Sequence, residues 1–214
     1  MVTYKDYPNR EMWLNGRKDS IGASEVAAAI GIKAFMTPKQ LWRLKTGREK
    51  DKDLSDNSRV EYGTHAEECL RNLFVLKHRH EYDMEYHQFR VYKNSDFPFL
   101  SCTLDGEILR KNDGKKGVWE CKTVEVTSSK TMEEWNGKIP DHYFAQVVAQ
   151  LAVTGYSFSI VSVELRFADC SSSIREYFYD SSELSDDIEY VVCGCRKFWE
   201  NVKSDREPET VLEL

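Results

Sequence analysis

The sequence has little proline, five residues in 214, and it lacks any tract rich in proline, glycine or serine that would link two domains. It also lacks internal repeats. The nearest candidate for a boundary is the charged stretch from residue 48 to residue 56, which is typical of a solvated loop. With 41% hydrophobic residues, a chain of this length can enclose a sizeable core. We therefore predict a single domain over residues 1–214.

Long hydrophobic runs are missing as well. No apolar stretch approaches the roughly 20 residues that cross a membrane as a helix. The N-terminal residues show no basic region followed by an apolar one, which is the pattern of a signal peptide. We expect a soluble, intracellular protein.

Cysteine and histidine do not form the clusters typical of metal or redox centres. The closest cysteine pair is Cys193 and Cys195, whereas an iron–sulfur site usually requires a C-x2-C run. The five histidines show no zinc-like spacing. We expect the six cysteines to be reduced structural thiols.

The net charge of −6 argues against general adhesion to nucleic acid, because phosphate binding depends on Lys and Arg. It leaves room for a localised basic groove. Acidic residues gathered around metal ions would contribute to such a total.

Five segments carry helix signals. Thr37 as N-cap, Pro38 in the first turn and Gly47 as a stop predict one short helix. Ser24 is predicted to cap a shorter one. Apolar spacing predicts the other three helices, at residues 59–77, 141–154 and 185–202.

Alternating and β-branched residues predict five strands. They cover residues 82–92, 100–109, 117–126, 157–167 and 174–179. The order of elements predicts an α/β fold with a central mixed, largely antiparallel sheet flanked by helices.

The predicted strand GVWECKTVEV, residues 117–126, carries an acid and an amine, Glu120 and Lys122, at the centre of an otherwise core-like segment. Because side chains alternate along a strand, Glu120 and Lys122 lie on one face. The preceding strand carries Asp105, and the Asp-Gly pair at 113–114 favours a hairpin between the two strands. This pairing would place the Asp105 carboxylate beside that of Glu120.

Two adjacent carboxylates repel each other unless a proton or a cation lies between them. Hard Mg²⁺ prefers a few carboxylate oxygens and keeps several waters. Lys122 beside such an ion could orient or deprotonate an attacking water, or neutralise charge developing on a phosphate. The alternative is a salt-bridged hairpin in which Lys122 pairs with Glu120 on a solvated face.

Two predicted helices offer further polar groups to such a site. Glu67 borders the apolar stripe of its helix, so it lies either at the wet edge of the stripe or in a metal site. Tyr143, Gln146 and Gln150 recur at i, i+3 and i+7 within an apolar helix. Their spacing indicates hydrogen bonds to a buried polar group or a ligand.

A possible anion site lies near the N-terminus. Arg17 precedes Ser24 by seven residues, and a helix that begins at Ser24 would present free N–H groups to an anion. The fork of the arginine would reinforce phosphate binding there. The alternative is that Ser24 is a plain helix cap.

These residues resemble the core of the PD-(D/E)XK nuclease superfamily, and their surroundings resemble its lambda exonuclease branch, the YqaJ-like viral recombinases. The matching segments run from Trp13 to Gly155 in the order found in the family. They are WLNGRKDSIGASEV, YGTHAEE, CTLDGEI, VWECKT and YFAQVVAQLAVTG. One departure is Leu104, which stands where the superfamily name has proline.

The resemblance implies a role for each matching residue. The catalytic residues would be Lys122, Glu120, Asp105, Glu67, Gln146 and Tyr143. Two Mg²⁺ ions, replaceable by Mn²⁺, would be held by Glu67, Asp105, Glu120 and the carbonyl of Cys121. The 5′-phosphate and the DNA would be contacted by Arg17, Ser24 and Trp13.

The resemblance also implies an activity. Such enzymes digest linear double-stranded DNA from 5′ ends and leave 3′ single strands for a partner annealing protein in phage recombination. It further implies a ring-shaped trimer around the DNA, in the cytoplasm of a bacterial or phage-infected cell. Two alternatives stay open: an endonuclease of the same superfamily, and a non-catalytic DNA-binding recombination module.

Overall fold

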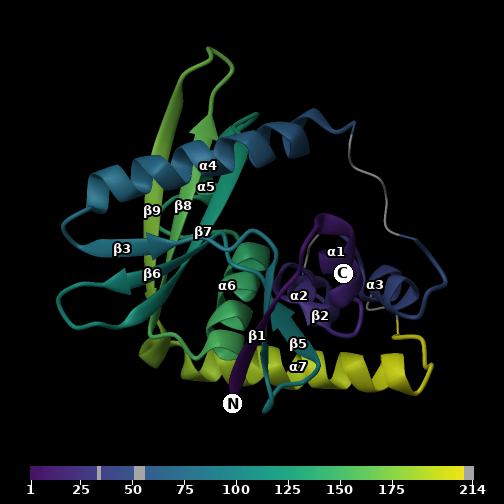
Figure 1. Cartoon of the computed structure of the whole chain (residues 1–214). Helices are drawn as coiled ribbons and strands as arrows, with labels where there is room; N and C mark the ends of the chain where they lie inside the picture. Colours follow the sequence, from purple (N-terminus) through teal and green to yellow (C-terminus); the bar gives the residue numbers. More distant parts are fainter. Residues whose placement is uncertain (33–34, 51–55, 210–214) are drawn as a thin grey trace.

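A computed structural model of the chain describes residues 1–32, 35–50 and 56–209. Its strands form two sheets, with helices packed around them (Figure 1). The α/β class with mixed sheets flanked by helices is confirmed. Within the predicted loop at 48–56, residues 51–55 lie outside the described residues. The single domain stays a prediction.

The larger sheet has five strands in the order β3-β6-β7-β8-β9. Neighbouring strands are antiparallel except β7 and β8, which run parallel. The predicted Asp-Gly turn joins β6 to β7, with Gly114 at a φ of 69°. The strands are β3 (Tyr82–Glu85), β6 (Gly106–Arg110), β7 (Lys116–Glu125), β8 (Phe158–Arg166) and β9 (Ser172–Asp180).

The smaller sheet has four strands in the order β1-β4-β5-β2. They are β1 (Val2–Asp6), β2 (Ile21–Gly22), β4 (Arg90–Asn94) and β5 (Leu100–Cys102). The predicted strands 82–92 and 100–109 are each divided between the two sheets, so between residues 82 and 109 the chain crosses from one sheet to the other twice. The second crossing, residues 103–105, ends at Asp105.

Helices cover both faces of the larger sheet. Figure 1 shows α4 (Ser58–His78) across one face, with α6 (Asp141–Thr154) on the opposite side. Helix α7 (Ser185–Lys203) packs against α6. The shorter helices are α1 (Arg10–Gly16), η1 (Ala23–Glu25), α2 (Val26–Ala29), α3 (Pro38–Lys45), α5 (Ser129–Glu134) and η2 (Ser181–Glu183).

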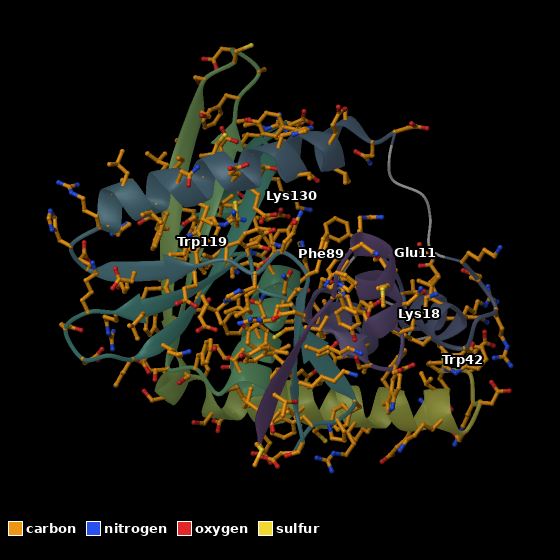
Figure 2. All side chains as sticks on the ribbon, in the orientation of Figure 1. Glu11, Lys18, Trp42, Phe89, Trp119 and Lys130 are labelled. Atoms are coloured by element: carbon orange, nitrogen blue, oxygen red, sulfur yellow. The ribbon has the colours of Figure 1, made fainter. Side chains whose placement is uncertain are left out.

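Strand β7 is buried between two hydrophobic clusters. Trp119, labelled in Figure 2, is fully buried. It belongs to the cluster under α4, together with Leu70 and Phe74 of that helix. Val118 points the other way, into the larger cluster around α6. Because both faces of β7 are covered along its buried part, residues 117–121, a charge there has to be compensated inside the protein.

Local helix signals were right at α3 and wrong at α2. The Thr37 hydroxyl accepts a hydrogen bond from the backbone N–H of Gln40 (3.3 Å), as expected of an N-cap. Ser24, by contrast, lies inside the 3-10 turn η1, and α2 begins only at Val26. Ser24 therefore does not cap a helix.

The cysteines are all free thiols, with Cys102, Cys121 and Cys195 buried. None of the helices formed by the described residues is long and apolar enough to span a membrane.

A buried carboxylate ties the two sheets together. Glu107 on β6 accepts hydrogen bonds from the hydroxyl of Tyr92 on β4 (2.9 Å), from that of Tyr156, and from Lys116 Nζ (2.6 Å). Burial by itself raises the pKa of Glu107, but the hydrogen bonds from Lys116 and the two tyrosines lower it below the ordinary value. The carboxylate thus stays ionised between the sheets.

We predict that Glu107→Ala lowers the free energy of unfolding by about 2 kcal/mol, because it leaves two tyrosine hydroxyls without their acceptor. Urea unfolding followed by circular dichroism measures this change. Glu85→Ala is the matched control, since Glu85 lies opposite Glu107 on β3 but its side chain is 73% exposed. Its effect should stay within about 0.5 kcal/mol, and equal losses in both variants would contradict the prediction.

Candidate active site

A cleft opens where β7 extends beyond β6. Strand β6 begins at Gly106, which pairs with Trp119, so Glu120 and the residues after it project past that strand. The cleft has a volume of about 610 Å³. The predicted site residues that line it are Trp13, Arg17, Ser24, Glu67, Asp105, Glu120, Cys121, Lys122 and Gln146. Segments far apart in the sequence therefore meet in one cavity.

Glu120 is the most enclosed carboxylate of the cleft, with 2% of its surface exposed. Its Oε1 accepts hydrogen bonds from Lys122 Nζ and Gln146 Nε2, both at 2.6 Å. Its Oε2 accepts one from Gln150 Nε2 at 2.5 Å. The two glutamines of the predicted polar stripe of α6 are thus confirmed as donors to a buried group, whereas Tyr143 is not among the donors to Glu120.

Lys122 is held beside Glu120 and under an aromatic ring. Its Nζ lies 4.9 Å from the centre of the Tyr143 ring, which places Tyr143 at the site although it does not line the cleft. Burial lowers the pKa of Lys122, but the carboxylates of Glu120 and Asp105 outweigh this and raise it above the ordinary value. The lysine is therefore charged at neutral pH.

The alternative of a solvated salt bridge does not hold for this pair. The side chains of Lys122 and Glu120 are only 18% and 3% exposed. A charge pair of this kind is costly to remove from water. Its burial on β7 therefore needs the further donors that α6 supplies.

Asp105 approaches β7 from the crossing between the two sheets. Its Oδ2 accepts a hydrogen bond from the backbone N–H of Cys121 (2.9 Å). Burial and the neighbouring charge of Glu120 raise the pKa of Asp105 well above its ordinary value. The hairpin between β6 and β7 thus brings Asp105 next to Glu120, as the sequence predicted.

Glu67 reaches the same cleft from α4, on the other face of the sheet. Close packing of α4 on β7 makes this possible, since a Cβ added to Gly63 would lie 3.3 Å from the Thr123 hydroxyl. Burial raises the pKa of Glu67, Arg71 opposes the rise, and the charge of Glu120 adds to it. Glu67 therefore interacts electrostatically with the other acids, although it also borders the apolar stripe of its helix.

The acids suit a hard divalent cation, although they do not form a closed cage. Among the described residues, no three His, Cys, Asp or Glu side chains converge tightly enough to enclose an ion. Mg²⁺ usually takes only one or two carboxylates and draws its other ligands from water and substrate phosphate. Asp105 and Glu120, two neighbouring carboxyl groups that supply oxygen ligands, fit that requirement.

A cationic wall, formed by Arg17 with Trp13 and Ser24, lines the same cleft as the acids. The Arg17 guanidinium lies 4.5 Å from the Trp13 ring, and its Nη2 is 3.5 Å from Ser24 Oγ. Trp13 packs in turn on Phe89, 6.1 Å between ring centres. Arg17 and Ser24 are therefore together as predicted, but the supporting argument from a helix N-terminus fails because Ser24 lies in a 3-10 turn.

Sequence reasoning missed Arg71 and Tyr86, which also belong to this region. Arg71 pairs with Glu67 and donates from Nε to the carbonyl oxygen of Asp105 (2.9 Å), and its guanidinium lies 3.5 Å from the Tyr86 ring centre. A signal for Arg71 was available, since a basic residue four positions after Glu67 lies on the same helix face.

The fold is shared with solved exonucleases. An alkaline exonuclease from Laribacter hongkongensis, LHK-Exo, superposes with a TM-score of 0.63 at 15% identity, covering 91% of this chain and 95% of that one. Its complex with dAMP gives a TM-score of 0.65, with the same identity and coverage. A phage-related exonuclease from Haemophilus somnus gives 0.57 at 11% identity, covering 87% of this chain and 96% of that one.

Sequence comparison places the chain within a family. A family model described as the YqaJ-like viral recombinase domain matches residues 12–157. The chain belongs to the YqaJ-like viral recombinase family. It is 27% identical over 148 residues to the uncharacterized protein YqaJ of Bacillus subtilis, covering 69% of this chain and 43% of that protein's length.

We predict that Mn²⁺ affinity rises with pH. The pKa values of Asp105 and Glu67 are raised, so both acids keep their protons to higher pH than usual, and a metal has to displace those protons. Calorimetric titration should show about tenfold tighter binding at about pH 8 than at about pH 5.5. Asp105→Asn should weaken binding and flatten this dependence, and an unchanged pH profile in that variant would contradict the assignment.

Proposed function

We propose that this chain is a Mg²⁺-dependent exonuclease that digests linear double-stranded DNA in the 5′-to-3′ direction and leaves 3′ single strands for homologous recombination. The observation that carries the proposal is the placement of Asp105, Glu120 and Lys122 in one cleft. Membership of the viral recombinase family and a fold shared with exonucleases support it. LHK-Exo was crystallised with dAMP, a mononucleotide of the kind that an exonuclease releases from DNA.

The acids would hold the metal and the lysine would act on the phosphate. Asp105 and Glu120 would hold a divalent ion, with Glu67 and the Cys121 carbonyl contributing, and the ion would supply an activated water and stabilise the leaving oxygen. Lys122, charged beside Glu120, donates a hydrogen bond to the scissile phosphate and offsets the charge that develops there. Gln146 holds Glu120 in place through Oε1.

The cationic wall would select the end of the DNA. Arg17 offers a planar fork that suits a terminal phosphate, and the Ser24 hydroxyl lies within reach of the same group. Trp13 stacks on the guanidinium and limits its movement. These contacts favour binding of a 5′-phosphorylated end next to the acids over binding of an internal part of the strand.

The proposal includes a ring-shaped homotrimer and a single-strand annealing partner. A net charge of −6 disfavours binding that depends on attraction alone, whereas a ring needs positive charge only along its channel. Sedimentation equilibrium tests the ring, and a monomeric mass at working concentration would contradict it.

Lys122→Ala should reduce cleavage of linear duplex about 1,000-fold or more, because it removes the charge that stabilises the reacting phosphate. End-labelled DNA in Mg²⁺ measures the rate. Lys197→Ala is the control, since Lys197 is exposed on α7 and does not line the cleft. Full activity of Lys122→Ala would refute the assignment.

The same assay separates the alternatives. Degradation of linear but not closed circular DNA is expected of the exonuclease. Cleavage of both forms would indicate an endonuclease. A wild-type protein that binds DNA without cutting it in Mg²⁺ or Mn²⁺ would indicate a non-catalytic module.

Arg17→Ala should remove most of the preference for phosphorylated ends. The loss of a charge-assisted hydrogen bond is worth about tenfold or more in cleavage rate. The measurement compares linear duplexes with and without a 5′-phosphate, so that each protein serves as its own control. If Arg17→Ala kept the wild-type ratio between the two substrates, the phosphate site would lie elsewhere.

A further inference from the structure

Arg71 links two acids that come from different parts of the fold. It lies on α4, four residues after Glu67, with a side chain that is only 11% exposed. Its Nη2 forms an ion pair with Glu67 Oε1, and its Nε donates to the backbone carbonyl oxygen of Asp105 at 2.9 Å. One guanidinium therefore connects the helix on one face of the sheet to the crossing that carries Asp105.

An aromatic ring restricts this guanidinium further. Its central carbon lies 3.5 Å from the centre of the Tyr86 ring, which lines the cleft. Arginine stacks on aromatic faces and presents donors in a rigid planar fork, whereas lysine is a point charge on a flexible stem. The three contacts of Arg71 thus depend on its shape as well as its charge.

The contacts of Arg71 orient the two acids in different ways. Asp105 is held at two points, because its carboxylate accepts the Cys121 N–H and its backbone oxygen accepts from Arg71. Glu67 is held at Oε1 only, and its Oε2 has no hydrogen-bond partner among the described residues. The ion pair therefore occupies one oxygen of Glu67 and leaves the other available.

We propose that Arg71 is a positioning residue that presents Glu67 and Asp105 to the divalent cation. The inference rests on the proposed function, since it takes the acids as the metal site. A simple neutralising charge would compete with the cation, so its loss would tighten metal binding. A positioning residue has the opposite effect, because acids that lose their support bind the metal more weakly.

The decisive variant is Arg71→Lys, which keeps the positive charge but loses the planar guanidinium and its fixed hydrogen-bond donors. Calorimetric titration with Mn²⁺ should show about tenfold weaker binding than in the wild type, the scale found when groups that orient metal ligands are removed. Arg71→Ala should weaken binding at least as much. Both would be checked for folding by circular dichroism and thermal melting.

The chain offers a matched control in Arg110. The guanidinium of this arginine also donates hydrogen bonds to a carboxylate, that of Asp113. Its central carbon lies 4.8 Å from the centre of an aromatic ring, that of Phe158. It lies at the turn between β6 and β7 and does not line the cleft. Arg110→Lys should therefore bind Mn²⁺ with wild-type affinity.

Cleavage kinetics provide a second readout. In Arg71→Lys the Mg²⁺ concentration for half-maximal rate should rise about tenfold, while kcat recovers at saturating Mg²⁺. A purely structural arginine would lower the melting temperature without changing the metal requirement. Wild-type or tighter Mn²⁺ affinity in Arg71→Lys would overturn the inference and leave the proposed function intact. A wild-type protein that binds no Mn²⁺ would overturn both.

Discussion

The structure of the cleft depends on the burial of Glu120. Removing a carboxylate from water costs several kcal/mol unless charges and hydrogen bonds replace the lost solvent. Lys122 on the same strand and Gln146 and Gln150 on α6 provide that replacement. Because these donors have to meet one carboxylate, β7 and α6 are held in a single relative position. The packing of the core and the geometry of the site are thus set by the same contacts.

Two cations pair with the acids and limit their mutual repulsion. Lys122 compensates Glu120 from within the strand, and Arg71 compensates Glu67 from α4. Among the residues that the structure describes, the Asp105 carboxylate accepts a hydrogen bond only from the backbone N–H of Cys121, and burial together with the charge of Glu120 raises its pKa. The remaining electrostatic strain is therefore concentrated at Asp105, beside Glu120. A divalent cation bound there, as we propose, would reduce this repulsion.

Local patterns predicted a large part of this site. Alternation along residues 117–126 placed Glu120 and Lys122 on one face, and the Asp-Gly turn brought Asp105 beside them, because both signals depend only on neighbouring residues. Arg71 was missed because its partners include a backbone oxygen 34 residues away. The Ser24 cap was wrong because the chain makes a 3-10 turn there before α2 begins.

The sequence by itself determined the strand and helix periodicity, the hairpin and the chemical identity of the acids and the lysine. Tertiary structure alone decided that the strands divide into two sheets, that β7 extends past β6 to open the cleft, and that Glu67 enters it from the opposite face. The physical reason is that periodicity reports which faces are buried, whereas the choice of which buried faces meet depends on packing between distant segments.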